Sequence, residues 1–309
     1  MTEERRIARA FAPGHVTTVF RRPPAPSRDP RGRGSIGAGL VLAAGALATA
    51  RWMPGEETGS RRLRLRSADG DALPITRDAL ERLLRDRRGT LEVEVRHELP
   101  VGQGFGMSAA GTLAATLAAS EVLGLPRSRA VALAHLADYS HGGGLGGVAA
   151  ILGGGFEIRR RPGIPPWGTV EHRPGPPSVI VGVAGRPLPT VRMLARRDLS
   201  ARLERASPEW PSLVRRPTLR ALGTISERFT DAVGVAPEGL SRLIRSLRGP
   251  GRWVAQAMFG RSFVAVPSTE RAREEILRTL ERRGIRAVEV PTAARGAHRL
   301  PPTGHAQGF

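Results

Sequence analysis

Two short stretches of the chain alternate between apolar and charged residues. Leu63–Arg66 and Leu91–Val95 place every second side chain on the same side. This period of two is typical of half-buried β-strands. Residues 7–20 alternate more loosely around Pro13 and Gly14. Because Pro and Gly favour turns, this pattern predicts a strand, a turn and a second strand.

The longest apolar run of the chain extends from Ile36 to Ala50 and consists mostly of Gly and Ala. It is shorter than the roughly 20 residues that a helix needs to span a bilayer. We therefore expect a buried helix here, and we expect no contact with a membrane. The preceding residues 21–35 are rich in Pro, Arg and Gly and predict a surface loop.

Helical spacing of apolar residues appears at three places in the first half. Thr76 could cap a helix that runs through Arg88, with Ala79, Leu80, Leu83 and Leu84 on its inner face. Two further helices are expected over Ser108–Leu123 and Arg127–Tyr139, followed by a strand over Phe156–Arg160.

The second half begins after residues 161–178, whose many Pro and Gly residues predict an interdomain link. The elements expected beyond the link are a strand over Val179–Val183, helices over about 190–206 and 217–247, strands over Trp253–Met258 and Ser262–Val266, a helix over Thr269–Arg283 and a strand over Ile285–Val290. Strands and helices do not alternate strictly, which predicts an α+β fold. We expect domains over 1–170 and 178–295 and a disordered tail over 296–309.

Three residue types are missing from the 309 residues, namely Cys, Lys and Asn. The absence of Cys excludes disulfides, thiolate nucleophiles and cysteine zinc sites. The absence of Lys excludes a P-loop, a protein-kinase active site and a pyridoxal phosphate Schiff base. Phosphate can therefore be bound only by backbone N–H groups, hydroxyls, Arg or a metal. The preference for Arg over Lys reflects either genome composition or heat adaptation.

The formal net charge of +20 attracts polyanions and could speed the arrival of ATP. Nucleic acid is the alternative ligand, but the Arg residues are scattered and only 4% of residues are aromatic. Stacking platforms for bases need aromatic side chains, so we expect no specific nucleic-acid partner. The charged N-terminus lacks an apolar signal core. Together with the absence of Cys, this predicts a cytoplasmic protein.

The most informative stretch is the Gly-rich turn before the helix that starts near Ser108. Glycines let the backbone approach a ligand closely. The first N–H groups of a helix have no partner in the helix, and its dipole adds about half a positive charge. This arrangement binds phosphate without lysine, and Ser108 adds a hydroxyl suited to Mg²⁺. A simple packing turn is the alternative. A hydrolase nucleophile elbow would need Gly where Ala110 stands.

This turn, with the pattern P-x-G-x-G-F-G-x-S-A-A, resembles the ATP-binding motif of the GHMP small-molecule kinases. Other stretches resemble that family in the same order, and several of them are typical of its archaeal pantoate kinases. They are Ala12–Val16, Gly34–Gly39, Ala134–Asp138, Gly144–Gly146, Gly154–Phe156 leading to Arg159, and Ala257–Ala265. The resemblance covers nearly all of residues 7–290.

The resemblance implies a ribosomal-protein-like N-terminal domain and a ferredoxin-like C-terminal domain, with ATP in the cleft between them. It places the triphosphate on Pro100, Gly102, Gln103, Gly104, Phe105, Gly106, Met107, Ser108, Ala109, Ala110 and Gly111. It gives Ser108 and Asp138 catalytic and Mg²⁺-binding roles, although the family usually has Glu at the position of Asp138. By itself Asp138 could equally be a charge on the surface of a helix.

The same resemblance implies that Ser35, His135, Arg159 and Thr190 bind pantoate. A guanidinium can hold a carboxylate with two hydrogen bonds, and hydroxyls and an imidazole can orient the rest of the substrate. The resemblance also allows a homodimer. The alternatives without a function in binding are a solvated strand end for Arg159, a structural role for His135 and a helix cap for Thr190.

One position departs from the family pattern. Gly147 stands where family members usually carry the Asp presumed to be the catalytic base. Either positioning suffices for phosphoryl transfer, or Asp138 or His135 acts through a water, or the enzyme is weakened, because losing a general base costs about 10²–10⁴-fold in rate. Another GHMP kinase, acting on homoserine, shikimate or a mevalonate-type alcohol, stays open, as does a basic nucleotide- or nucleic-acid-binding protein without catalysis.

Overall fold

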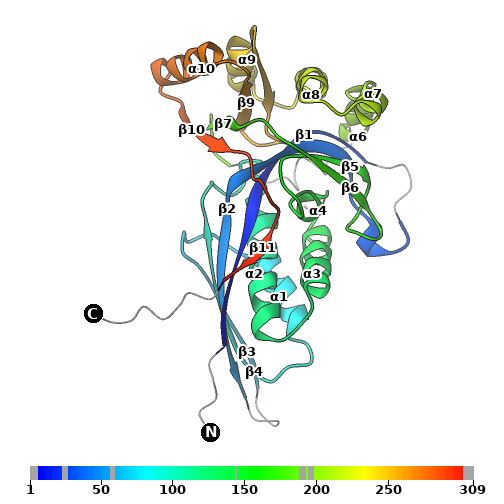
Figure 1. Ribbon diagram of the computed structural model, residues 1–309, viewed down its shortest axis with the longest axis vertical. Coiled ribbons are helices and arrows are strands. Elements are labelled where there is room, and N and C mark those ends of the chain that lie inside the picture. The colour runs from blue at the N-terminus through cyan, green and yellow to red at the C-terminus, as the bar shows by residue number, and fades with distance from the viewer. Residues whose placement is uncertain are drawn as a thin grey trace.

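Two β-sheets organise the computed structural model, which describes residues 6–22, 27–55, 60–142, 145–187, 193 and 198–301. The first sheet has seven strands, with the order β11-β1-β2-β4-β3 and with β5 joining β2 to β6. The second has four strands in the order β10-β7-β9-β8. Figure 1 shows α1, α2 and α3 on one side of the first sheet, and the second sheet with its helices at the top of the view. The α+β prediction is confirmed.

Two long antiparallel strands, β1 (Arg6–Arg21) and β2 (Ile36–Pro54), form the centre of the first sheet. The turn predicted at Pro13 and Gly14 is wrong, because β1 continues through these residues with only a shift of register. The helix predicted over 36–50 is also wrong, because this run forms most of β2. A strand buried on both faces loses its period of two, so periodicity could not distinguish it from a buried helix.

The small residues of β2 have a packing reason. The first part of β2 pairs with β1 and β5, and its later part pairs with β1 and β4. Helix α2 (Met107–Val122), itself rich in Ala, packs against β1 and β2. A Cβ added at Gly45 would lie 2.1 Å from the Ala12 carbonyl oxygen, so the sheet tolerates no side chain there.

The half-buried strands β3 (Arg61–Ser67) and β4 (Gly89–His97) are confirmed; they run parallel to each other. Between them, α1 spans Pro74–Leu83 and is shorter than predicted. Thr76 does not cap this helix. Its buried hydroxyl instead lies 2.9 Å from that of Thr112 in α2, which joins the two helices.

The remaining helices on this side are α3 (Arg127–Ser140) and the short α4 (Gly147–Ala150). Strand β5 (Phe156–Arg161) pairs with β2, and β6 (Thr169–Arg173) pairs with β5. The predicted link over 161–178 therefore contains a strand of the first sheet. The loop predicted over 21–35 contains one 3-10 turn, η1 (Pro30–Gly32).

The second sheet comprises β7 (Ser178–Val183), β8 (Arg252–Gln256), β9 (Ser262–Pro267) and β10 (Arg286–Pro291). The single helix predicted over 217–247 is two, α8 (Leu219–Val233) and α9 (Glu238–Leu247). Gly234 ends α8 in the left-handed conformation, and Pro237 precedes α9. The other helices are α6 (Leu199–Arg205), the unpredicted α7 (Trp210–Arg215), and α10 (Glu270–Arg282).

The end of the chain returns to the first sheet. Strand β11 (His298–Leu300) pairs antiparallel with β1, from Arg9 opposite Leu300 to Phe11 opposite His298. The disordered tail predicted from residue 296 is therefore wrong for these three residues, and residues 302–309 lie outside those described. No helix in the described ranges is long and apolar enough to cross a membrane.

Candidate active site

A pocket of about 280 Å³ opens where α2, α3 and the first sheet meet the turn between β8 and β9. Its walls come from several parts of the chain that lie far apart in the sequence. The lining residues are His15, Thr17, Ser35, Ile75, Val101, Gly102, Gly104, Gly106, Met107, Ser108, Ala109, Asp138, His141, Leu145, Gly147, Arg159 and Met258.

The Gly-rich turn forms one wall of the pocket. Gly102, Gly104 and Gly106 have φ of 76°, 80° and 71°, which residues with a side chain rarely adopt. Helix α2 begins at Met107, and no side chain caps its N-terminus. Its first N–H groups therefore face the pocket without a side-chain acceptor, and the helix dipole favours an anion there. Ser108 lies at this helix end and is exposed.

The turn between β8 and β9 of the second sheet packs against this wall. A Cβ at Gly104 would lie 2.1 Å from the Ala257 carbonyl oxygen, so backbone packs directly on backbone. The Ser262 hydroxyl donates a hydrogen bond to the Gln103 carbonyl oxygen. The Gln103 side-chain amide donates to the Gly185 carbonyl oxygen at 2.8 Å. The Gly-rich turn is therefore held by residues of the second sheet and its turns.

Only part of the predicted nucleotide-binding stretch lines the pocket, namely Gly102, Gly104, Gly106, Met107, Ser108 and Ala109. Pro100, Gln103, Phe105, Ala110 and Gly111 are not among the lining residues. The Phe105 carbonyl oxygen accepts a 2.9 Å hydrogen bond from the His15 backbone N–H, which fastens the turn to β1. The residues outside the lining thus shape and anchor the turn.

Asp138 reaches the pocket from α3 and is 6% exposed. Burial raises the pKa of its carboxyl to about 7, because the charged form loses its hydration. No hydrogen bond or ion pair joins its side chain to another described residue. Among the described lining residues it is the one carboxylate. A Cβ at Gly147 would lie 4.0 Å from Asp138 Oδ2. The position where the family usually carries an Asp therefore lies beside Asp138.

A second buried carboxylate, Glu157 of β5, lies behind the opposite wall. Its Oε1 accepts a 2.9 Å hydrogen bond from His15 Nε2 of β1 and forms an ion pair with Arg159. His15, Glu157 and Arg159 are 3%, 0% and 2% exposed. We call these three residues the floor network.

Glycines of β2 make room for the floor network, because β2 runs between β1 and β5. A Cβ at Gly37 would lie 2.5 Å from an Arg159 guanidinium nitrogen, and one at Gly39 would lie 2.8 Å from His15 Nε2. The two glycines therefore let the His15 side chain of β1 meet the charged side chains of β5 across the intervening strand.

The charges of the floor network follow from its contacts. Burial alone would raise the pKa of Glu157, but the charge of Arg159 and the hydrogen bond from His15 outweigh it and lower the pKa. Burial lowers the pKa of His15, which is neutral near pH 7. Glu157 Oε2 and Arg159 Nε have no hydrogen-bond partner among the described residues. Arg159 lines the pocket, so a polar ligand can reach its guanidinium.

The other predicted substrate residues have different surroundings. Ser35 lines the pocket and donates its hydroxyl to the Leu145 carbonyl oxygen. His135 of α3 is buried, lies outside the pocket lining and is close to the Pro30 and Arg33 carbonyls. Burial lowers its pKa more than these carbonyls raise it. Thr190 lies outside the described residues. The structure thus brings Ser35 and Arg159 together with Ser108 and Asp138, and leaves His135 behind the lining.

Two residues of the floor network, His15 and Glu157, were absent from the predicted site. His15 belongs to the stretch Ala12–Val16 that resembles the family's first motif, so a signal existed. Glu157 stands between Phe156 and Ile158 in a strand whose first four residues are all buried. A charge between the apolar residues Phe156 and Ile158 is its sign in the sequence.

Comparison with known proteins identifies the family of this chain. The GHMP kinases N terminal domain matches residues 74–155. The pantoate kinase of Thermococcus kodakarensis is 31% identical over 280 residues, which cover 87% of this chain and 90% of that protein. The pantoate kinase of Methanospirillum hungatei is 31% identical over 210 residues, covering 64% of this chain and 68% of that protein.

A solved structure of a phosphotransferase related to the coenzyme A biosynthesis pathway superposes with a TM-score of 0.84. It is 27% identical, and the match covers 97% of this chain and all of that one. The predicted kinase fold, with its glycine turn at the start of a helix, is thereby confirmed. This chain belongs to the pantoate kinase family of the GHMP kinases.

Proposed function

We propose that this protein transfers the γ-phosphoryl group of ATP to a hydroxyl of pantoate, giving ADP and 4-phosphopantoate for coenzyme A biosynthesis. The names of its relatives support this substrate. The observation that carries the proposal is that one pocket contains two groups able to bind anions. They are the backbone N–H groups at the start of α2 and the buried guanidinium of Arg159. An anionic nucleotide and a carboxylate acceptor can occupy these sites together.

On the nucleotide side, the phosphates would lie against Gly102, Gly104, Gly106 and the first turn of α2. Backbone N–H groups and the helix dipole bind phosphate here in place of the missing lysine. The donors for Mg²⁺ would be the Ser108 hydroxyl and the Asp138 carboxylate, oxygen ligands of the kind that Mg²⁺ prefers. The buried Asp138 carboxylate lacks a partner in the described chain, which fits such a role. Bound Mg²⁺ would neutralise phosphate charge.

On the acceptor side, Arg159 would bind the pantoate carboxylate. Glu157 holds the guanidinium from behind, and the unpaired Arg159 Nε offers a further donor. The Ser35 hydroxyl, now bonded to the Leu145 carbonyl, would turn to a substrate hydroxyl. His135 would act indirectly, by supporting the loop that carries Ser35, and Thr190 stays a prediction.

During transfer, the bond from the γ-phosphorus to the ADP oxygen breaks, a bond to the pantoate hydroxyl oxygen forms, and the hydroxyl proton leaves. Gly147 offers no carboxylate to take this proton. Phosphoryl transfer depends mainly on positioning and charge stabilisation. We therefore expect this site to work without a dedicated base, with the proton leaving to water or to Asp138. An enzyme using free ATP fits the cytoplasm, and a homodimer stays a prediction.

A panel of acceptors tests the proposal. ADP release is measured with saturating ATP and Mg²⁺ and with pantoate, homoserine, shikimate or mevalonate as acceptor. We expect release with pantoate to exceed that with the others by at least about tenfold, because the four acceptors all carry a carboxylate and a hydroxyl but differ in the spacing between them, and Arg159 and Ser35 must hold the acceptor with its hydroxyl at the γ-phosphate. Ser108→Ala should raise the KM for ATP.

A uniform response to all acceptors would contradict the assignment of pantoate. Nucleotide binding without ADP release for any acceptor would instead support a non-catalytic protein, the second candidate, which the absence of a carboxylate at Gly147 favours.

A further inference from the structure

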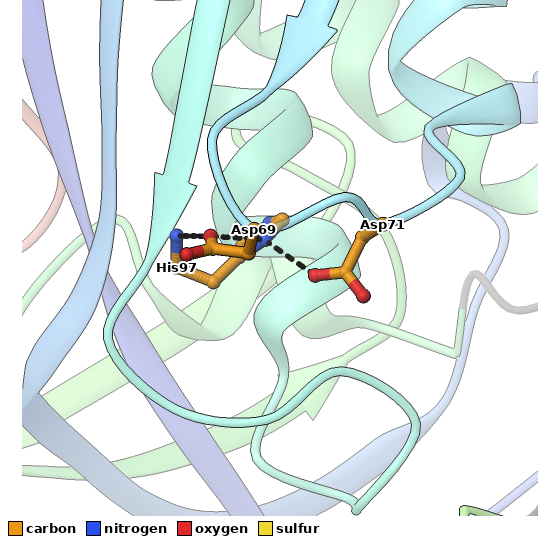
Figure 2. A group of neighbouring side chains, drawn as sticks. All are labelled: Asp69, Asp71 and His97. Atoms are coloured by element: carbon orange, nitrogen blue, oxygen red, sulfur yellow. Dashed lines mark hydrogen bonds and ion pairs between the residues drawn. The ribbon is translucent and has the colours of Figure 1, made fainter.

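Outside the pocket, two aspartates and a histidine converge at one end of the first sheet. Asp69 and Asp71 lie in the turn between β3 and α1, and His97 ends β4 (Figure 2). The Ser67 hydroxyl accepts hydrogen bonds from the backbone N–H groups of Asp69 at 3.2 Å and Asp71 at 3.1 Å. The turn is therefore curled so that both carboxylates face the imidazole.

The distances in this cluster suit metal ligands better than hydrogen-bonded partners. His97 Nδ1 lies 3.3 Å from Asp71 Oδ2 and 3.7 Å from Asp69 Oδ2. N–H···O hydrogen bonds are usually about 2.7–3.2 Å long. Ligand atoms about 2.1 Å from a tetrahedral metal are about 3.4 Å apart. One ligand atom from each residue can be chosen so that all three lie within 4.8 Å of one another.

The imidazole of His97 points into this cluster without a hydrogen bond of its own. Its side chain is 3% exposed, and neither ring nitrogen has a hydrogen-bond partner among the described residues. Its backbone is held, however, because the His97 N–H donates to Asp69 Oδ2 at 2.7 Å. A buried polar ring that lacks a partner is costly unless a ligand satisfies it.

The charge around the cluster supports a cation. In this Arg-rich chain, nearby carboxylates such as Asp78 and Glu92 pair with Arg82 and Arg64. Asp69 and Asp71 form ion pairs only with His97 among the described residues. When the imidazole is neutral, two negative charges remain without a positive partner.

We propose that Asp69, Asp71 and His97 bind one divalent transition metal of the Zn²⁺ type, with water at the remaining position. Imidazole nitrogen and carboxylate oxygen are both ligands of Zn²⁺. Mg²⁺, which the kinase reaction uses, prefers oxygen ligands only. This site is therefore distinct from the nucleotide pocket in position and in metal preference.

The bound metal would stiffen the support of the phosphate-binding turn. A Cβ at Gly111 would lie 2.6 Å from His97 Nε2, so the other edge of the imidazole packs directly on α2. Gly111 lies one helical turn after Ser108, and His97 shortly precedes Gly102. A metal on Nδ1 would join the turn after β3 to the end of β4 directly behind this helix. We expect a structural metal that raises thermal stability.

The test uses full-length protein stripped of metal with a chelator, without nucleotide. Calorimetric titration with Zn²⁺ should give one tight equivalent per chain, and the Tm should rise with Zn²⁺ concentration. Co²⁺ in place of Zn²⁺ should give the visible absorption of a tetrahedral nitrogen and oxygen site. Asp71→Asn should weaken binding at least about tenfold, because the Asp71 side chain pairs only with His97 among the described residues while its N–H still holds the turn.

Two control variants locate the metal. Asp86→Asn removes an exposed carboxylate just after α1 and should bind Zn²⁺ like the wild type. Asp138→Asn removes the carboxylate of the pocket and should also keep the tight equivalent. No Zn²⁺ uptake by the wild type, equal uptake by Asp71→Asn, or loss of uptake only in Asp138→Asn would each overturn the proposal. None of these outcomes depends on kinase activity, so failure here and failure of the proposed function are distinguishable.

Discussion

Asp138 and Glu157 are both buried carboxylates at the same pocket, yet their surroundings give them opposite properties. Asp138 has no partner among the described residues, and burial raises its pKa to about 7. Glu157 is more deeply buried, but Arg159 and His15 lower its pKa. The comparison teaches that burial alone does not set the charge of an acid. The Asp138 carboxylate is therefore free to bind a cation, whereas the Glu157 carboxylate already has its positive partner within the protein.

The largest expected effect is on the floor network. Glu157→Gln leaves the buried charge of Arg159 without its counterion, which typically costs about 3–5 kcal/mol of stability. We expect the free energy of unfolding, measured by urea denaturation at pH 7.5, to fall by about this amount. Glu171→Gln, on the neighbouring strand β6, is the matched control, because its pairs with Arg160 and Arg173 are closer to the surface. It should cost less than about 1 kcal/mol. Equal losses for the two variants would contradict the network.

Asp138→Asn should raise the free energy of unfolding, in contrast to Glu157→Gln. The folded protein binds the Asp138 proton more tightly than the unfolded chain, because the pKa is raised from 3.8 to about 7. Stability therefore falls as the pH rises through this range, by at most about 4 kcal/mol at pH 8. Without Mg²⁺ and nucleotide, we expect Asp138→Asn to be about 2 kcal/mol more stable than the wild type at pH 8.

The stabilising effect of Asp138→Asn should vanish below pH 4, where both states of the wild type hold the proton. Turnover of this variant should fall at least about 100-fold, because the pocket loses the carboxylate proposed to hold Mg²⁺. A variant that is less stable at pH 8, or as active as the wild type, would show that Asp138 is satisfied by contacts within the protein.

The smallest expected effect concerns the position of the family's Asp. A Cβ at Gly147 would lie 3.0 Å from the Ala109 Cβ and 4.0 Å from Asp138 Oδ2. Gly147→Asp should therefore displace the start of α2 and add a like charge, and we expect turnover to fall about tenfold, or about 1.4 kcal/mol. The double variant Ala109→Gly with Gly147→Asp removes the steric conflict and should recover part of this loss. Higher turnover for the single variant would show instead that a missing base limits the wild type.

The sequence predicted the elements whose burial leaves a pattern. Strands β3 and β4 have one face in solvent, so apolar and charged residues alternate along them. The glycine turn is recognisable because glycines cluster where the backbone needs positive φ angles. Strand β2 was predicted as a helix because consecutive residues along it are apolar and buried, so no period of two remains. Strand β11 has three residues, too few for any period, and its existence depends on the edge of β1.

The residues of the candidate site likewise fall into those that the sequence could predict and those that it could not. Ser108 and the lining glycines are close together in the chain, so a local motif could find them. Glu157 and His15 are 142 residues apart and meet only because Gly37 and Gly39 open the strand between them. His135 was predicted from the resemblance as a substrate residue, and the fold places it behind the lining, where helix packing rather than sequence decides what it touches.

The most direct test of the account is a phosphorus NMR spectrum of the purified protein with ATP, Mg²⁺ and pantoate. The account predicts that the γ-phosphate signal decreases while the signals of ADP and of a new phosphate monoester grow in equal amounts, and only when pantoate is present. Inorganic phosphate as the sole product, at a rate independent of pantoate, would contradict it.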